Sequence, residues 1–209
     1  LGYDVVSDNH IGDWGTQFGK LIAAYKKWGD KSAVEKNPIE ELLGLYIKFH
    51  AEAENDPQLE DEGRMWFKNL EDGHKDATSL WKWFREVSMK EFARQYKRLG
   101  VHFDYTIGES FYTPMLNDVI EKSLGMNIAK KDGEAVVVSF DDLPSMLIRK
   151  SDGATLYQTR DLATIKYQKD KFRFWKRIYV VGSEQKLYFR QVFRIAQLLG
   201  YITDGECVH

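Results

Sequence analysis

The chain has a single cysteine, Cys207, and only four prolines among 209 residues. One cysteine excludes an internal disulfide and is typical of a reducing compartment, so we expect a cytoplasmic protein. No apolar run approaches the roughly 20 residues that a membrane-spanning helix needs, and no signal peptide is evident, so we expect no membrane partner. Basic and acidic residues nearly cancel, giving a net charge of −2, which excludes a strong overall attraction to nucleic acid.

The chain has enough apolar residues for a substantial core. Hydrophobic residues make up 43% and aromatic residues 14% of the sequence, which suits one large domain or one domain with an insertion. Helical periodicity is found in residues 15–28, 39–55, 57–70 and 76–99. Strand signals are found in residues 3–6, 101–104, 126–129, 135–138, 146–149, 154–157 and 177–182. This order predicts an α/β fold with a parallel, nucleotide-binding type of sheet interrupted by an all-helical insertion.

Residues 9–19, which read NHIGDWGTQFG, directly follow the first predicted strand. Ligands of parallel α/β sheets gather at the carboxyl ends of strands, so this loop is a candidate floor of an active site. A tight turn would explain its glycines but not the combination of His10, Asp13, Trp14 and Gln17. The loop fits neither a P-loop nor a dinucleotide fingerprint, because its glycine spacing is wrong for both. Cys207 and His209 alone make no metal site, and we predict no bound metal.

Three polar side chains are predicted at strand ends on the carboxyl side of the sheet. Tyr157 ends a predicted strand, and Thr159 is expected to cap a helix that carries Asp161 in its first turn. Gln185 starts a helix after the predicted buried strand 177–182. A carboxylate matches the planar guanidinium group with two charge-assisted hydrogen bonds, so the set suits a cationic amino acid such as arginine. From the residue types alone, the simpler interpretation of Asp161 is an acid that stabilises a helix N-terminus.

Several stretches, in order along nearly the whole chain, resemble the arginyl-tRNA synthetases of bacterial type. They are residues 9–19, the segments Phe103-Asp104 and Gly108-Glu109-Ser110-Phe111-Tyr112, residues 151–163, and residues 179–185. The resemblance implies a class I synthetase catalytic core with a Rossmann-like parallel sheet. It also implies that Tyr157, Asp161 and Gln185 contact substrate arginine.

The resemblance implies an arginine–tRNA ligase with L-arginine, ATP accompanied by Mg²⁺, and tRNA as substrates. We expect residues 1–30 and 100–209 to form part of the catalytic domain, residues 31–99 to form the helical insertion, and the protein to be a monomer. The HIGH and KMSKS segments of the family are expected before Leu1 and after His209, so the catalytic residues are unknown. Because those segments stabilise charge on the phosphates, we expect the chain alone to be inactive. The alternative is a non-catalytic helical module that binds protein or RNA.

Overall fold

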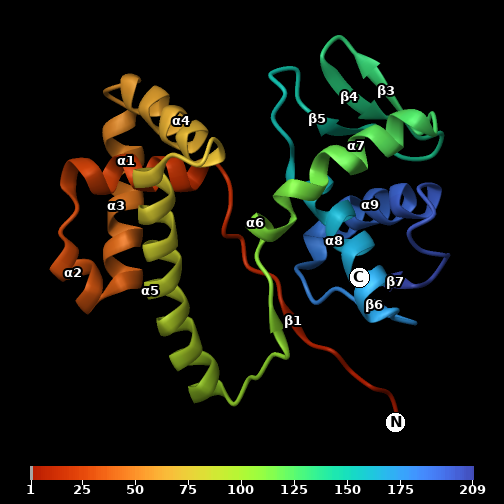
Figure 1. Cartoon of the computed structure of the whole chain (residues 1–209), viewed down its shortest axis with the longest axis horizontal. Helices are drawn as coiled ribbons and strands as arrows, with labels where there is room; N and C mark the ends of the chain where they lie inside the picture. Colours follow the sequence, from red (N-terminus) through yellow and green to blue (C-terminus); the bar gives the residue numbers. More distant parts are fainter. Residues whose placement is uncertain (1) are drawn as a thin grey trace. The chain divides into compact units, whose positions relative to one another are not determined.

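The computed structural model describes residues 2–209 and divides into two compact units, Leu1–Ser110 and Phe111–His209. Each unit is described separately below (Figure 1). The first unit contains helices and one short parallel strand pair. Its elements are β1 (Asp8–Asn9), α1 (Thr16–Trp28), α2 (Lys31–Lys36), α3 (Pro38–Ala53), α4 (Gln58–Glu71), α5 (Lys75–Leu99) and β2 (Tyr105–Thr106).

The helix ends of the first unit follow from local sequence. The side chain of Asp30 accepts a hydrogen bond from the Ala33 amide at 2.7 Å and thereby caps α2. Pro38 is the first residue of α3, where its missing amide hydrogen costs nothing. Gly100 ends α5 with a positive φ of 68°, which glycine adopts without steric strain. The predicted helices of this unit are therefore confirmed to within a few residues.

Helix α1 packs most closely against α4, through facing glycines. A Cβ on Gly19 would collide with the carbonyl oxygen of Gly63 and would lie 2.6 Å from the Phe67 nitrogen. The backbones can approach each other this closely only because Gly19 has no side chain. Around this crossing, α1, α3 and α5 bury the large side chains of Ile22, Phe49 and Phe84. Helices α3 and α5 also lie side by side (Figure 1).

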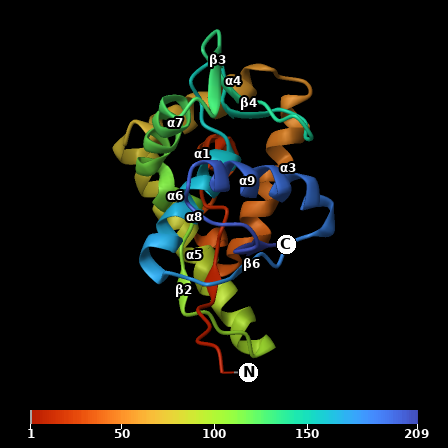
Figure 2. The ribbon, with the colours of Figure 1, turned by 90° about the vertical axis from the view of Figure 1, so that its right-hand side faces the viewer.

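The second unit combines an antiparallel sheet, a short parallel strand pair and two long helices (Figure 2). Helix α6 (Glu109–Tyr112) spans the boundary between the units. The elements that follow are η1 (Thr113–Met115), α7 (Leu116–Gly125), β3 (Ala129–Asp132), β4 (Ala135–Val138), β5 (Met146–Arg149), α8 (Tyr157–Phe172), β6 (Arg177–Ile178), η2 (Ser183–Gln185), α9 (Lys186–Leu198) and β7 (Cys207–Val208). Strands β3, β4 and β5 form the antiparallel sheet, and β6 pairs in parallel with β7. The turn Asp132–Gly133 leads from β3 into β4, with Gly133 at a φ of 58°.

Five strand predictions are wrong in position or burial. Residues 126–129 overlap β3 only at Ala129. Residues 3–6 form no strand, and Val5 is 79% exposed; β1 begins later, at Asp8. Residues 101–104 precede β2 rather than forming it, and residues 154–157 contribute only a single bridge, at Thr155. Residues 177–182 form a strand over two residues only, and Val180 is 93% exposed. A short apolar run becomes a buried strand only where other elements cover it along its length. Within 177–182, Tyr179 packs against the rings of Phe189 and Phe193 on α9, whereas the next residue, Val180, stays exposed.

The two compact units do not coincide with the predicted domain boundaries. Helix α1 falls within the predicted α/β domain, but its apolar side packs against α3, α4 and α5. The reason is that Ile22, Ala23 and Ala24 are fully covered by those helices. A functional division into residues 1–30 with 100–209, and 31–99, stays a prediction.

Candidate functional site

Tyr157 and Asp161 lie four residues apart in the first turns of α8, so they project from one face of that helix. The sequence places Tyr157 at a strand end, and this is wrong, because Tyr157 is the first residue of α8. Thr159 does not cap the helix either, since the cap position belongs to Leu156. The two predicted ligands nevertheless come together. Tyr157 is 57% exposed and Asp161 is half-buried, so this face is accessible within its unit.

The start of α8 is fixed to the neighbouring sheet by two side chains. Gln158 donates a hydrogen bond from its amide nitrogen to the Leu147 carbonyl oxygen at 2.5 Å. The Thr159 hydroxyl donates to the Ile148 carbonyl oxygen at 2.5 Å. Both acceptors belong to β5, and both donors are buried. The helix turn that carries Tyr157 and Asp161 is therefore anchored on the side away from them.

Tyr188, on α9, completes this cluster and was missed by the sequence analysis. Its hydroxyl donates a hydrogen bond to Oδ2 of Asp161. Its ring lies 5.1 Å from the ring of Tyr157, centroid to centroid. Burial, reinforced by the negative charge of Asp161, raises the pKa of Tyr188 far above its ordinary value, so the phenol remains a hydrogen-bond donor. Only its position three residues after Gln185 could have drawn attention to it.

Tyr179 is a further phenol near this cluster. Burial raises the pKa of Tyr179 well above its usual value, and the charge of Asp161 acts in the same direction. The guanidinium carbon of Arg177 lies 4.2 Å from the centre of the Tyr179 ring, within the range of a cation–π contact. Near Asp161 there are thus aromatic rings, and one of them, Tyr179, has a cation against its face.

Gln185 lies at the end of η2, directly before α9, and is exposed. Its backbone amide donates to the Gly182 carbonyl oxygen at 3.1 Å. Within residues 2–209, the structure records no hydrogen bond from its side chain to Tyr157 or Asp161. Two of the three predicted ligands therefore share one cluster, while the role of Gln185 stays a prediction.

The loop of residues 9–13 lies against a groove of about 700 Å³ in the first unit. The groove is also lined by side chains of α1, α3 and α5, most of them apolar: Phe18, Leu21, Leu42, Leu43, Tyr46, Phe84, Met89 and Phe92. His10 is exposed at this groove, and Asn9 donates a hydrogen bond to the Tyr96 hydroxyl at 3.2 Å. The predicted floor of a site thus does line a concave surface.

Asp13 is a structural residue of this loop. Its side chain is buried and accepts hydrogen bonds from Arg85 Nε and from both the amide and the hydroxyl of Ser110, each at 2.8 Å. Its carbonyl oxygen accepts a further bond from the Trp81 indole at 2.7 Å. Asp13 therefore fixes α5 and the turn at Ser110 to the loop. The presence of Asp13 in the motif is therefore explained by these structural contacts.

Trp14 and Gln17 are also accounted for by local contacts. The Trp14 ring meets those of Phe67 and Trp81 edge to face, at centroid distances of 5.8 and 5.5 Å. Gln17 donates from its amide nitrogen to the Trp14 carbonyl oxygen at 3.2 Å. Of the side chains that made the motif unusual, His10 and Gln17 are exposed and line the groove.

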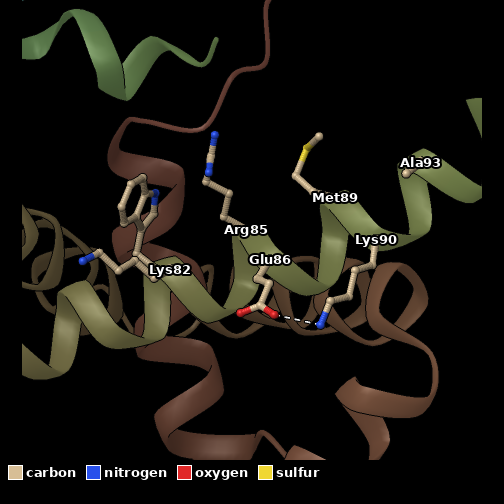
Figure 3. A pocket seen from close by; sticks show the side chains of 7 residues that line it. Lys82, Arg85, Glu86, Met89, Lys90 and Ala93 are labelled. Carbon is tan, nitrogen blue, oxygen red and sulfur yellow. Dashed lines mark ion pairs between the residues drawn. The ribbon is translucent and has the colours of Figure 1, made fainter. Parts of the chain in front are cut away.

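A second hollow of about 640 Å³ is lined by side chains of α5 (Figure 3). Glu86 and Lys90 form an ion pair at 2.7 Å there, and Arg85 and Met89 lie on another side of the helix (Figure 3). Arg85 is already bound to Asp13. This face therefore offers paired surface charges rather than a catalytic group.

Comparison with known proteins agrees with this architecture. A family model described as tRNA synthetases class I (R), catalytic domain, matches residues 1–209. The chain is 52% identical to an arginine–tRNA ligase of Clostridium botulinum over 210 residues and 54% identical to one of Exiguobacterium over 207, covering 100% and 98% of the chain. It spans 37% of the length of each. A crystal structure of arginyl-tRNA synthetase from Plasmodium falciparum matches with a TM-score of 0.83 at 24% identity, over all of this chain and 36% of that one.

The helices, the parallel strand pairs and these matches define a class I synthetase catalytic core. The chain belongs to the arginyl-tRNA synthetase family and represents part of its catalytic domain. The predicted α/β fold class is confirmed. No helix within residues 2–209 is long and apolar enough to cross a membrane.

Proposed function

We propose that the protein containing this chain is an arginine–tRNA ligase. It joins L-arginine to ATP, with Mg²⁺ accompanying the nucleotide, releases pyrophosphate, and transfers arginine to the terminal adenosine of tRNA. The observation that carries the proposal is the placement of the Asp161 carboxylate and the Tyr157 phenol on one face of α8. The family match over the whole chain supports the same activity.

In this proposal Asp161 is the partner of the substrate guanidinium group. A carboxylate and a guanidinium ion are both planar and form two parallel, charge-assisted hydrogen bonds. The Tyr157 hydroxyl and the Gln185 amide oxygen are the proposed acceptors for the remaining guanidinium hydrogens. A site built this way rejects neutral analogues strongly, because such an analogue leaves the carboxylate without a cation.

We further propose that residues 1–209 alone do not activate arginine. The sequence contains no loop with the spacing of a known phosphate-binding motif. Catalysis of phosphoryl and adenylyl transfer depends on stabilising charge on the phosphates, so this chain supplies arginine recognition and the protein outside it supplies the rest.

The proposal is tested by arginine-dependent exchange of pyrophosphate into ATP, measured on the complete protein. Exchange should require arginine and fail with citrulline, which has the same shape without the positive charge. Asp161→Asn should abolish exchange at arginine concentrations that saturate the unmodified protein. The matched control is Asp170→Asn on the same helix, since Asp170 forms a surface ion pair with Lys166. Exchange that is indifferent to arginine, or that survives Asp161→Asn, would refute the proposal.

The alternative of a non-catalytic interaction module finds little support in the helical unit. Its surface charges are of both signs and are largely paired, as in Lys20–Glu60, Lys27–Glu62 and Lys68–Asp72. Such pairs usually mark a solvated face. Binding of a macromolecule by this unit, in a complete protein without exchange activity, would favour the module.

A cytoplasmic location and a monomeric state complete the proposal. We propose the cytoplasm because a tRNA ligase supplies protein synthesis, which takes place there. Sedimentation of the complete protein at micromolar concentration tests the oligomeric state, and a dimer mass would overturn that part alone.

A further inference from the structure

Tyr188 contacts both predicted arginine ligands of α8. Its hydroxyl donates to the Asp161 carboxylate, and its ring lies against the ring of Tyr157 at 5.1 Å. Both contacts come from another helix, because Tyr188 lies in the first turn of α9. The mutual placement of Asp161 and Tyr157 therefore depends on a residue outside their own helix.

Tyr188 is well suited to hold other groups in place, because its own position is fixed. It is half-buried, and its ring meets that of the buried Phe189 edge to face at 4.9 Å. Helix α9 is itself attached by Gln191, which donates to the Pro144 carbonyl oxygen at 2.6 Å. The packing of α8 against α9 thus brings a fixed phenol to the carboxylate.

The hydrogen bond from Tyr188 is compatible with a bound guanidinium group. An ionised carboxylate has about four lone-pair sites on its two oxygens, and one phenol hydrogen occupies one of them. A phenol that remains protonated is neutral, so it donates to this carboxylate without placing there a positive charge that would compete with the guanidinium group. It also restricts rotation of the carboxylate, which lowers the entropy lost when a ligand binds.

We infer that Tyr188 is a positioning residue for arginine recognition: it orients the Asp161 carboxylate through its hydroxyl and the Tyr157 phenol through its ring, and it thereby contributes to selection of a guanidinium side chain. This inference rests on the proposed function, because it assigns Tyr188 a role in the same site. It adds a residue that acts through the ligands and does not itself touch the substrate guanidinium.

The test is Tyr188→Phe in the complete protein, which removes the hydroxyl and keeps the ring. We expect the KM for arginine in pyrophosphate exchange to rise about 10-fold to 100-fold, the range for loss of one hydrogen bond to a charged group. The KM for ATP and the kcat at saturating arginine should stay within about twofold, because neither depends on the guanidinium contact. Discrimination against citrulline should fall by a similar factor to the rise in KM.

The matched control is Tyr201→Phe. Tyr201 is only 7% exposed, lies beyond the other end of α9 and contacts Lys122 through its ring. Removal of the Tyr201 hydroxyl should leave the KM for arginine and the KM for ATP unchanged. Thermal unfolding of both variants separates positioning from general loosening, since a purely structural role would lower the melting temperature and raise both KM values together.

The outcomes separate the inference from the function beneath it. If the unmodified protein shows no arginine-dependent exchange, the proposed function fails and the inference fails with it. If Asp161→Asn abolishes exchange while Tyr188→Phe leaves the KM for arginine unchanged, the function stands and the inference is overturned. A selective rise in the KM for arginine, absent from the Tyr201→Phe control, supports the inference.

Discussion

Replacement of Asp13 by asparagine should destabilise the first unit far more than an ordinary surface substitution. The Asp13 carboxylate is only 4% exposed and accepts three hydrogen bonds, from Arg85 and from two atoms of Ser110. Asparagine has the same shape, but its nitrogen can donate only. One carboxylate oxygen accepts from both Arg85 and the Ser110 hydroxyl, so at least the Arg85 bond would lose its acceptor when the amide nitrogen takes that place.

The size of the effect follows from the exposure of the two partners. Breaking a fully buried ion pair costs about 3–5 kcal/mol, because the remaining charge is left in a dry environment. The Arg85 side chain is 38% exposed, so water can solvate it in part and the loss is smaller. We expect the free energy of unfolding to fall by about 2 kcal/mol, with the Ser110 amide still bonded to the amide oxygen of the new side chain.

The assay is equilibrium unfolding in urea of the chain of residues 1–209, followed by tryptophan fluorescence, since Trp14 and Trp81 lie next to Asp13. Asp61→Asn is the control, because Asp61 is 76% exposed and forms a surface pair with Arg64. The control should change stability by less than about 0.5 kcal/mol. Equal stability of the two variants would refute the structural role of Asp13.

Two further predictions concern packing and alkaline stability. Gly19→Ala should destabilise the chain by about 1–3 kcal/mol, because the new methyl group forces α1 away from α4. Gly44→Ala, at an exposed helical position with open space around it, should stabilise the chain by about 0.5–1 kcal/mol. Urea unfolding measures both changes, and equal effects would exclude the close approach of α1 and α4. Burial raises the pKa of the Cys207 thiol from about 9 to about 11, so the folded state keeps a proton that the unfolded state loses. The stabilisation from this thiol is complete below about pH 9 and is lost as the pH rises toward 11. In thermal unfolding measured across that pH range, Cys207→Ala should reduce the fall in the free energy of unfolding by about 1–2 kcal/mol. An unchanged fall would contradict a buried thiol.

Helices could be predicted from this sequence because their signals are local. Pro38 and Gly100 mark helix ends through their own backbone preferences, and the apolar spacing within each helix selects its buried face. Strands could not be located as well, because their burial depends on distant partners. Val180 belongs to an apolar run that indicates a buried strand, yet it is almost fully exposed since no described element covers it.

The candidate site shows the same difference between local and distant information. Tyr157 and Asp161 could be chosen from chemistry and resemblance, and helical spacing then places them on one face whatever the error in the strand boundary. Tyr188 could not be chosen, because its contact with Asp161 bridges two helices and is set by their packing. The role of Asp13 was hidden for the same reason, since its partners lie 72 and 97 residues away along the chain.

Those long separations carry a consequence for how the chain folds. Strands β1 and β2 pair in parallel only after the whole succession of helices α1 to α5 has been placed between them. Closing so long a loop is entropically costly until the helices are compact, so the helices should collapse first and the strand pair should form late. The hydrogen bonds that Ser110 donates to Asp13 join the two ends of that succession. They should therefore form last, in a slow step that is limited by the chain topology. During synthesis, β1 leaves the ribosome long before β2 has been made. Until then β1 is an unpaired strand, and the helices α1 to α5 are the elements that can fold next to it.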